Sequence, residues 1–329
     1  MSATSAPARP SAALARLAAG AAPLAGVGVV LLAAAVTTPS LFNSANLTLV
    51  LFQAGLIGVT AVGQTVVLLT AGIDLSVGAV IGLTTVIVAS RTGGEDTGLP
   101  AAIGLAILAG AGVGAVNAAL VILRRVPPFV ATFATFVLVQ GAITASTRGA
   151  PSGDIPRALA PLGADKLAGI PVPMWLFAGV AAVAAVVLAR TSVGRRLYAT
   201  GANRRAAALS GIRTGWVIAG AYVVCALLAV FAGLIDAAYV GHVDAQLSRS
   251  LNLDSVAAAV IGGVALTGGQ GHVGQTVAGV ALLAVLLVWM LELGAGPGGQ
   301  LAVEGAAILL AAWLQHRGVF TRFTQSGGG

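Results

Sequence analysis

Charged residues are scarce in this chain of 329 residues. Only 8% of them are Asp, Glu, Lys or Arg, whereas about 25% are charged in a typical soluble domain. Apolar residues make up 58%, and the mean hydropathy is +0.99. A single core surrounded by water does not need so many apolar side chains. The composition therefore excludes an ordinary soluble domain and predicts a membrane protein.

Cysteine and histidine are also scarce. Cys225 is the only cysteine, so no disulfide can form within the chain. The histidines His242, His272 and His316 are far apart and have no cysteine partners, so we predict no metal site. The sequence has no plausible His–carboxylate or Ser–Lys constellation, and we therefore expect no catalytic residues. This argues against an intramembrane enzyme.

The sequence lacks the motifs of nucleotide-binding and nucleic-acid-binding proteins. A P-loop needs a lysine on the phosphates, and the only lysine, Lys166, follows Asp165 outside any such motif. Gly269-x-Gly271-x-x-Gly274 fits a dinucleotide fingerprint formally, but no strand precedes it, so we interpret it as a tight turn. We expect no cofactor on this chain. The net charge of +7 forms no basic face or motif typical of nucleic-acid binding.

Long apolar stretches recur from end to end, each near the length that crosses about 30 Å of hydrocarbon. They predict an all-α polytopic integral membrane protein with about ten transmembrane helices. The first stretch follows Arg9 and Arg16, a charged start that resembles a signal peptide. It is long enough to cross the membrane, however, and further spans follow it, so we expect this stretch to be a retained anchor. The predicted spans are 17–37, 47–70, 74–90, 99–123, 128–146, 172–190, 215–240, 254–267, 274–293 and 300–315.

The distribution of basic residues predicts the orientation, because cytoplasmic segments carry an excess of Lys and Arg. With both termini in the cytoplasm, only five basic residues lie outside: Arg91, Arg148, Arg157, Lys166 and Arg249. The other twelve lie inside: Arg9, Arg16, Arg124, Arg125, Arg190, Arg195, Arg196, Arg204, Arg205, Arg213, Arg317 and Arg322.

This topology predicts a single transmembrane domain (17–316) between a cytoplasmic N-terminal tail (1–16) and a cytoplasmic C-terminal tail (317–329). Two connections are too long to be simple turns. Residues 147–171 lie outside and carry charge and proline, whereas residues 191–213 lie inside and hold much of the basic charge. Both are candidate docking surfaces on opposite sides of the bilayer.

The stretch that begins at Asp74 recurs later in the chain. DLSVGAVIG (74–82) aligns without gaps to DSVAAAVIG (254–262). The two copies open the third and eighth spans, which run in opposite directions, so we expect a five-plus-five inverted repeat of the kind found in transporters. Chance alignment is the alternative, because Ala, Val and Gly are abundant in this chain.

Asp74 is the only charged residue in 47–90. An Asp at mid-span costs roughly 2.5–3.5 kcal/mol on insertion, and a place in the first turn of a helix, for Asp74 and Asp254 alike, reduces that cost. Asp74 is therefore either a helix cap or a residue beside a solute path, where irregular backbone is tolerated. Asp236, late in the seventh span, is either interfacial or pathway-lining.

Other polar residues lie within the spans. Amides and hydroxyls could hydrogen-bond a polar solute, and they could equally join helices to one another. Gln53, Thr135 and Gln140 belong to this group. The residues that we predict for the solute path are Gln64, Thr65, Asp74, Asn117, Thr132, Asp236 and Asp254.

Four blocks carry a resemblance to a known family. They are GQTVVLLTAGIDLSVGAV (63–80), VPPFVATFAT (126–135), GANRRAAALSGI (201–212) and DSVAAAVIGGVALTGGQGHVGQT (254–276). With them, residues 45–316 resemble the membrane-spanning permeases of bacterial ABC importers of ribose, xylose and arabinose. The resemblance implies a permease subunit that moves a monosaccharide across the inner membrane by alternating access.

The resemblance also implies partners. They are a second permease copy or paralogue, a cytoplasmic ATPase that binds ATP and Mg, and a periplasmic or extracellular sugar-binding protein. A short cytoplasmic helix of such permeases enters the ATPase through a loose E-A-A-x-x-x-G motif, and 205–211 (RAAALSG) matches its Ala-Ala and Gly positions. The implied coupling residues are Asn203, Arg204, Arg205, Ala206, Ala207 and Gly211. Arg204 and Arg205 stand where relatives often carry acids, which suggests an acidic cleft on the ATPase.

Two further functions remain open. Related permeases import branched-chain amino acids or nucleosides, so the solute could belong to either class. A stand-alone, ion-coupled secondary transporter is the other possibility, since Asp74 and Asp236 could carry protons within the membrane.

Overall fold

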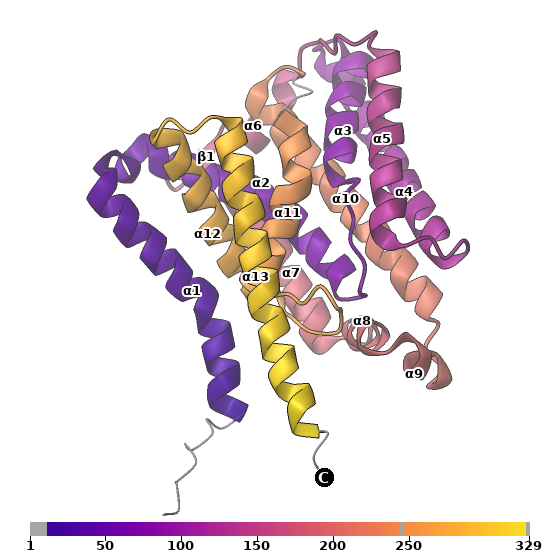
Figure 1. Cartoon of the computed structure of the whole chain (residues 1–329). Coiled ribbons are helices and arrows are strands. Elements are labelled where there is room, and N and C mark those ends of the chain that lie inside the picture. The colour runs from indigo at the N-terminus through magenta and orange to yellow at the C-terminus, as the bar shows by residue number, and fades with distance from the viewer. Residues whose placement is uncertain (1–11, 244–246, 327–329) are drawn as a thin grey trace, which may run out of the picture.

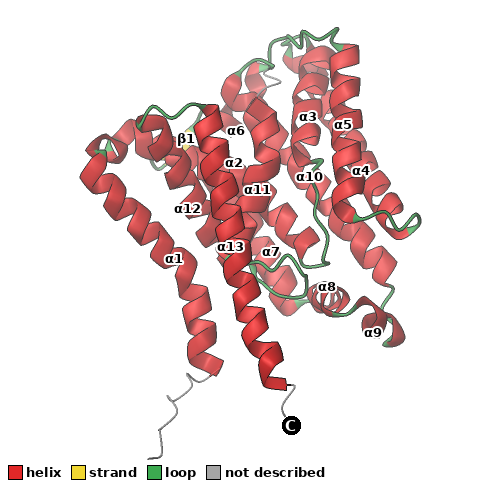
Figure 2. Ribbon diagram, viewed as in Figure 1, coloured by secondary structure: helices red, strands yellow, loops and turns green. Residues whose placement is uncertain are grey.

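The computed structural model describes residues 12–243 and 247–326, and these residues are almost entirely helical (Figures 1 and 2). Apolar chain segments cross a membrane as helices because a helix satisfies its own backbone hydrogen bonds. Long helices coincide with all ten predicted spans, which confirms the all-α class. They are α1 (Ala12–Thr37), α2 (Ser44–Leu68), α3 (Val77–Thr92), α4 (Leu99–Ile122), α5 (Pro128–Ser146), α7 (Val172–Arg190), α10 (Thr214–Val240), α11 (Leu247–Gly262), α12 (Val273–Glu292) and α13 (Pro297–Ser326).

Among the described residues, α2, α4, α5, α7, α10 and α12 are long and apolar enough to cross a membrane. The segment 147–171 holds the 3₁₀-helix η3 (Arg157–Leu159), α6 (Ala160–Gly163) and two short antiparallel strands, β1 (Lys166–Leu167) and β2 (Ile170–Pro171). The segment 191–213 holds α8 (Ser192–Ala202) and α9 (Arg204–Leu209). Two further 3₁₀-helices, η1 (Pro39–Phe42) and η2 (Asp96–Gly98), precede α2 and α4.

Helices α2 and α10 form the centre of the bundle. Helix α10 packs against α2, α3 and α4, and α2 packs against α7, α11 and α12. Every residue of α2 from Ala54 to Leu68 is buried. Helix α1 lies at one edge of the bundle, α13 runs along its front, α4 and α5 lie at the other edge, and α8 and α9 lie together at one end (Figure 1).

Two non-helical segments interrupt the helical core. Residues 69–76 separate α2 from α3, as predicted for 71–74, and residues 263–272 separate α11 from α12. We call them the first and the second break. The eighth span was predicted to begin at Asp254 and to end at Thr267, and both bounds are wrong. Helix α11 begins at Leu247, so Asp254 lies about two turns inside it and not in its first turn.

The polar residues before Asp254 explain that error. Hydropathy locates only the apolar part of a helix, whereas α11 begins in a polar stretch that includes Ser250 and Asn252. The side chain of Asn252 is buried, and its Oδ1 accepts a hydrogen bond from the backbone N–H of Gly78 in the first turn of α3. A polar side chain can extend an apolar helix where a neighbouring helix end supplies its partner.

Candidate functional site

Asp74 lies in the first break and is completely buried. Its Oδ1 accepts hydrogen bonds from the backbone N–H of Ser76 (2.9 Å), the Ser76 hydroxyl (2.6 Å) and Nδ2 of Asn117 on α4 (3.3 Å). Asn117 Nδ2 also donates to Ser76 Oγ (2.8 Å). The carboxyl group stands just before α3, where the positive end of the helix dipole stabilises negative charge.

The backbone of the first break is fastened by side chains from three further helices. The hydroxyls of Thr132 on α5 (3.3 Å) and Tyr222 on α10 (3.5 Å) both donate to the carbonyl oxygen of Ile73. Gln64 on α2 also binds this backbone. When its side-chain nitrogen faces the Asp74 carbonyl, that nitrogen donates to the carbonyl (3.2 Å) and the side-chain oxygen accepts from the Asp74 N–H (3.2 Å). The unwound backbone therefore finds partners within the protein, as the apolar surroundings require.

Four of the predicted path residues thus belong to one buried cluster: Gln64, Asp74, Asn117 and Thr132. The geometry favours the capping alternative for Asp74, although the carboxyl precedes α3 and does not lie in its first turn as predicted. Asp74 lines neither of the two cavities described below. The cluster ties α2, α4 and α5 to the break that they surround.

The remaining predicted path residues lie elsewhere. Thr65 on α2 shares a hydrogen bond of 2.6 Å with Thr276 on α12, so it joins two core helices. Asp236 is buried near the end of α10 and lines neither cavity. Asp254 lines a cavity at the other end of α2 from the first break. The predicted path residues therefore do not form one continuous path in this structure.

The end of α8 packs directly against both breaks. A Cβ atom on Gly201 would overlap the carbonyl oxygen of Leu69, and one on Gly269 would come within 2.6 Å of the Ala202 backbone nitrogen. Gly269 also donates its N–H to the Leu69 carbonyl (3.0 Å), and the Tyr198 hydroxyl donates to the Gly271 carbonyl (2.8 Å). We call this meeting of residues 69–72, 198–203 and 268–271 the junction.

A cavity of about 810 Å³ opens beside the junction, and we call it the junction cavity. It lies between the first break, the segment 125–128 that precedes and starts α5, and the residues that connect α8 to α9. Two basic residues, Arg125 and Arg204, contribute to its wall. Helix α8 therefore contacts the first break directly, and Arg204 at the start of α9 lines the cavity that lies beside that break.

Helix α9 contains most of the predicted coupling residues. Asn203 caps it by accepting the Ala206 N–H (3.0 Å). Gly211, just after its end, has a φ of +82°, in the left-handed region that favours glycine. Ala207 is buried, whereas Leu209 is 84% exposed. The exposed residues of the helix are Arg204, Arg205, Ala206, Ala208 and Leu209.

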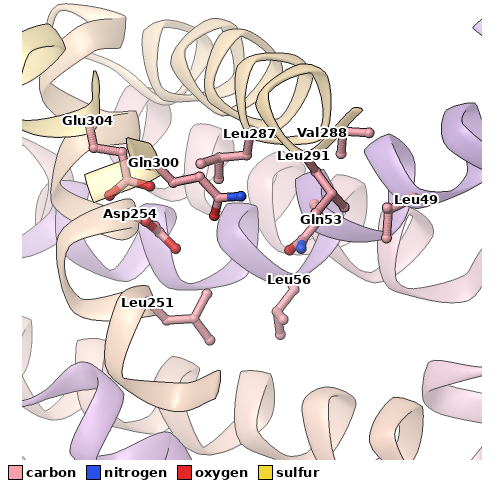
Figure 3. Close-up of a pocket in the computed structure, with 10 residues that line it drawn as sticks. All are labelled: Leu49, Gln53, Leu56, Leu251, Asp254, Leu287, Val288, Leu291, Gln300 and Glu304. Carbon is pink, nitrogen blue, oxygen red and sulfur yellow. The ribbon is translucent and has the colours of Figure 1, made fainter. Parts of the chain in front are cut away.

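A second cavity, of about 230 Å³, lies between α2, α11, α12 and α13, and we call it the α13 cavity (Figure 3). Its polar residues are Gln53, Asp254, Gln300 and Glu304. Only Asp254 was among the predicted path residues. Gln300 and Glu304 were missed, although a lone Glu in the last predicted span is the same signal that singled out Asp74.

Comparison with known proteins connects this architecture to transport. Residues 46–312 match the family described as "Branched-chain amino acid transport system / permease component". The ribose import permease protein RbsC of Escherichia coli (strain K12) is 35% identical over 297 residues, which cover 88% of this chain and 92% of that protein. RbsC of Bacillus subtilis (strain 168) is 34% identical over 298 residues, which cover 90% and 92%.

A third relative is the autoinducer 2 import system permease protein LsrC of Yersinia enterocolitica serotype O:8. It is 34% identical over 242 residues, which cover 74% of this chain and 67% of that protein. No solved structure matches the chain significantly.

The helices and their hydropathy define a multi-pass integral membrane protein. The chain belongs to the family of transport-system permease components, since the family match covers most of its length. The resemblance carried by the four sequence blocks is therefore confirmed, and the chain is a permease component of an import system.

Substitution of Asp74 tests whether it acts as a cap. Asp74→Asn keeps an oxygen at Oδ1, so we expect nearly unchanged thermal stability in detergent and nearly unchanged transport. Asp74→Leu removes the acceptor of the Ser76 N–H and of the Ser76 hydroxyl, which costs about 1–3 kcal/mol. Thermal unfolding followed by size-exclusion chromatography measures the stability of both variants. A large loss of transport in a stable Asp74→Asn protein would contradict a purely capping role.

Proposed function

We propose that this chain is the transmembrane subunit of an ATP-driven importer that receives a monosaccharide from a binding protein and moves it by alternating access. The observation that carries the proposal is the contact between the α8–α9 unit and the first break at Gly201. Displacement of an exposed helix at one end of the bundle would thereby reach the core. Rigid-body rearrangements of this kind are biased by partner contacts.

A monosaccharide is the proposed solute because the ribose import permease proteins match the chain over about nine-tenths of its length. The family description names branched-chain amino acids instead, so that class is the alternative which an experiment must distinguish. Nucleosides are a third class.

The proposed partners bind at the two ends of the molecule, at α9 on one side of the membrane and at residues 147–171 on the other. A separate ATPase, with its ATP and Mg, would receive α9, because the helix exposes the basic residues Arg204 and Arg205 and the apolar residue Leu209 (84% exposed). Acidic residues in the ATPase cleft would complement this face. A sugar-binding protein would dock on 147–171 at the opposite side. A second permease copy or paralogue would complete the pair, and no cofactor is assigned to this chain.

The proposed orientation places both termini in the cytoplasm and the chain in the inner membrane. It rests on the twelve-to-five division of basic residues. In this orientation, α8, α9 and the junction face the cytoplasm, and the α13 cavity lies in the outer half of the bundle.

Reconstitution tests the proposed function. Proteoliposomes that contain the permease, its ATPase and its binding protein should take up labelled D-ribose only when ATP is present. Uptake without the ATPase would support the alternative of a stand-alone secondary transporter. Uptake of L-leucine or a nucleoside in place of D-ribose would contradict a monosaccharide as the solute, but it would still support an ATP-driven importer.

Substitutions in and after α9 test the coupling helix. Leu209→Asp places a charge on the exposed apolar residue, and Gly211→Trp strains the left-handed position that ends the helix, so we expect about tenfold weaker co-purification of the ATPase. Leu167→Asp is the matched control, because Leu167 is also exposed (63%) but lies in β1 within 147–171. Normal ATPase association of a well-inserted Leu209→Asp protein would refute the assignment.

Cysteine labelling tests the orientation. The native thiol is buried, since Cys225 is 1% exposed, and Cys225→Ala removes it altogether. In that background, Arg205→Cys should react with a membrane-impermeant maleimide only after the membrane is opened, whereas Leu167→Cys should react in intact cells with a permeabilised outer membrane. Labelling of position 205 from outside would overturn both the orientation and the coupling role of α9.

A further inference from the structure

The α13 cavity contains polar side chains that the junction and the Asp74 cluster do not use. Figure 3 shows the side chains of Gln53, Asp254, Gln300 and Glu304 gathered around one space, with leucines completing the wall. They come from α2, α11 and α13. Polar groups with little exposure, inside an otherwise apolar bundle, are expensive to maintain and mark functional sites in membrane proteins.

Glu304 points to a ligand more directly than the other residues do. It is only 3% exposed, and its carboxyl group hydrogen-bonds to Asp254, which is 4% exposed. A hydrogen bond between two carboxyl groups needs a proton on one of them, because two adjacent carboxylates would repel each other. The second oxygen, Glu304 Oε2, accepts no hydrogen bond from any described residue. Buried polar atoms are normally hydrogen-bonded. Because this oxygen lies on the wall of a cavity, a ligand in the cavity could supply the missing donor.

The size of the cavity distinguishes between ligands. At roughly 30 Å³ for each water molecule, a volume of about 230 Å³ holds several waters or one molecule of monosaccharide size. A dehydrated metal ion instead needs a tight cage of oxygens about 2.0–2.6 Å from it. Among the described residues, no group of three His, Cys, Asp or Glu side chains could hold a metal ion.

The chemistry of the wall fits a neutral molecule with many hydroxyl groups. The carboxyl groups of Glu304 and Asp254 accept hydrogen bonds from hydroxyls, and a carboxyl group that carries a proton also donates one. The amide of Gln53 has two N–H donors and an acceptor, whereas the Gln300 amide already donates one N–H to the Ala295 carbonyl (3.5 Å) and retains one donor and its acceptor. Leu56, Leu251 and Leu287 complete the cavity with apolar surface, as is usual for sites that bind small molecules.

We propose that the α13 cavity is a transient binding station for the imported sugar, in which Glu304 and Asp254 accept its hydroxyls and Gln53 and Gln300 orient it. This inference rests on the proposed function as a sugar importer. In the proposed orientation the station lies in the outer half of the permease, where a sugar released by the binding protein enters. Its affinity is low, because a permease supplied by a binding protein must also release the sugar.

The test uses the complete complex of permease, ATPase and binding protein in proteoliposomes. Glu304→Leu and Gln300→Leu each remove hydrogen bonds to the sugar, and we expect D-ribose uptake to fall about tenfold for each. ATP hydrolysis stimulated by the loaded binding protein should stay at the wild-type level, because α9 is unchanged. Glu304→Gln keeps the shape and a neutral hydrogen-bonding group, so it should retain more uptake than Glu304→Leu.

Gln140→Leu is the matched control, because Gln140 is half-buried on α5 and lines neither cavity. It should transport normally. Saturation-transfer NMR with D-ribose and the permease in nanodiscs supplies a direct readout, and the signal should disappear in Glu304→Leu.

Three results would contradict the proposal that the α13 cavity binds the imported sugar. Uptake and NMR signal could be unchanged in Glu304→Leu and Gln300→Leu. Uptake and stimulated hydrolysis could fall together with thermal stability, which would assign these residues to packing alone. Thermal stabilisation by Ca²⁺ and not by D-ribose would assign the cavity to a cation. Failure of the proposed function is a different observation, since the wild-type complex would then show no ATP-dependent uptake of D-ribose.

Discussion

The structure depends on how an interrupted helix satisfies its backbone inside an apolar bundle. The N–H groups of residues 69–72 still bond to carbonyls at the end of α2, but the backbone at Ile73 and Asp74 lies outside any continuous helix and must find other partners within the protein. Side chains of α2, α5 and α10 supply partners to the backbone of Ile73 and Asp74, and Asn117 of α4 donates to the Asp74 carboxyl group. The positions of those four helices are therefore coupled to one short stretch of chain.

The sequence predicted the helices well because apolar length is a strong local signal. All ten predicted spans correspond to helices, and the break near 71–74 was located by Gly72 and Asp74 within an otherwise apolar stretch. The start of α11 was missed, because Asn252 obtains its hydrogen-bond partner from α3, which the sequence alone does not reveal. Local composition predicts a helix, whereas its exact ends depend on tertiary contacts.

The candidate sites were predicted less completely, for the same physical reason. The cap at Asn203 and the left-handed conformation of Gly211 are local features, whereas the coupling role of these residues was implied by the family resemblance and stays a prediction. The pairing of Glu304 with Asp254 depends on how α13 packs on α11, and no periodicity in the sequence encodes that contact. The predicted path residues shared a polar character, but the fold separates them into a cap, a helix–helix tie and the wall of a cavity.

The glycines at the junction have a mechanical consequence. Side chains can absorb a small displacement by changing rotamer, but main-chain atoms in direct contact cannot. At Gly201 and Gly269, polypeptide backbone rests on polypeptide backbone with no side chain between them. A displacement of α8 would therefore move the backbone of the first break at Leu69 directly, as in a stiff linkage, because no side chain between them can take up the movement.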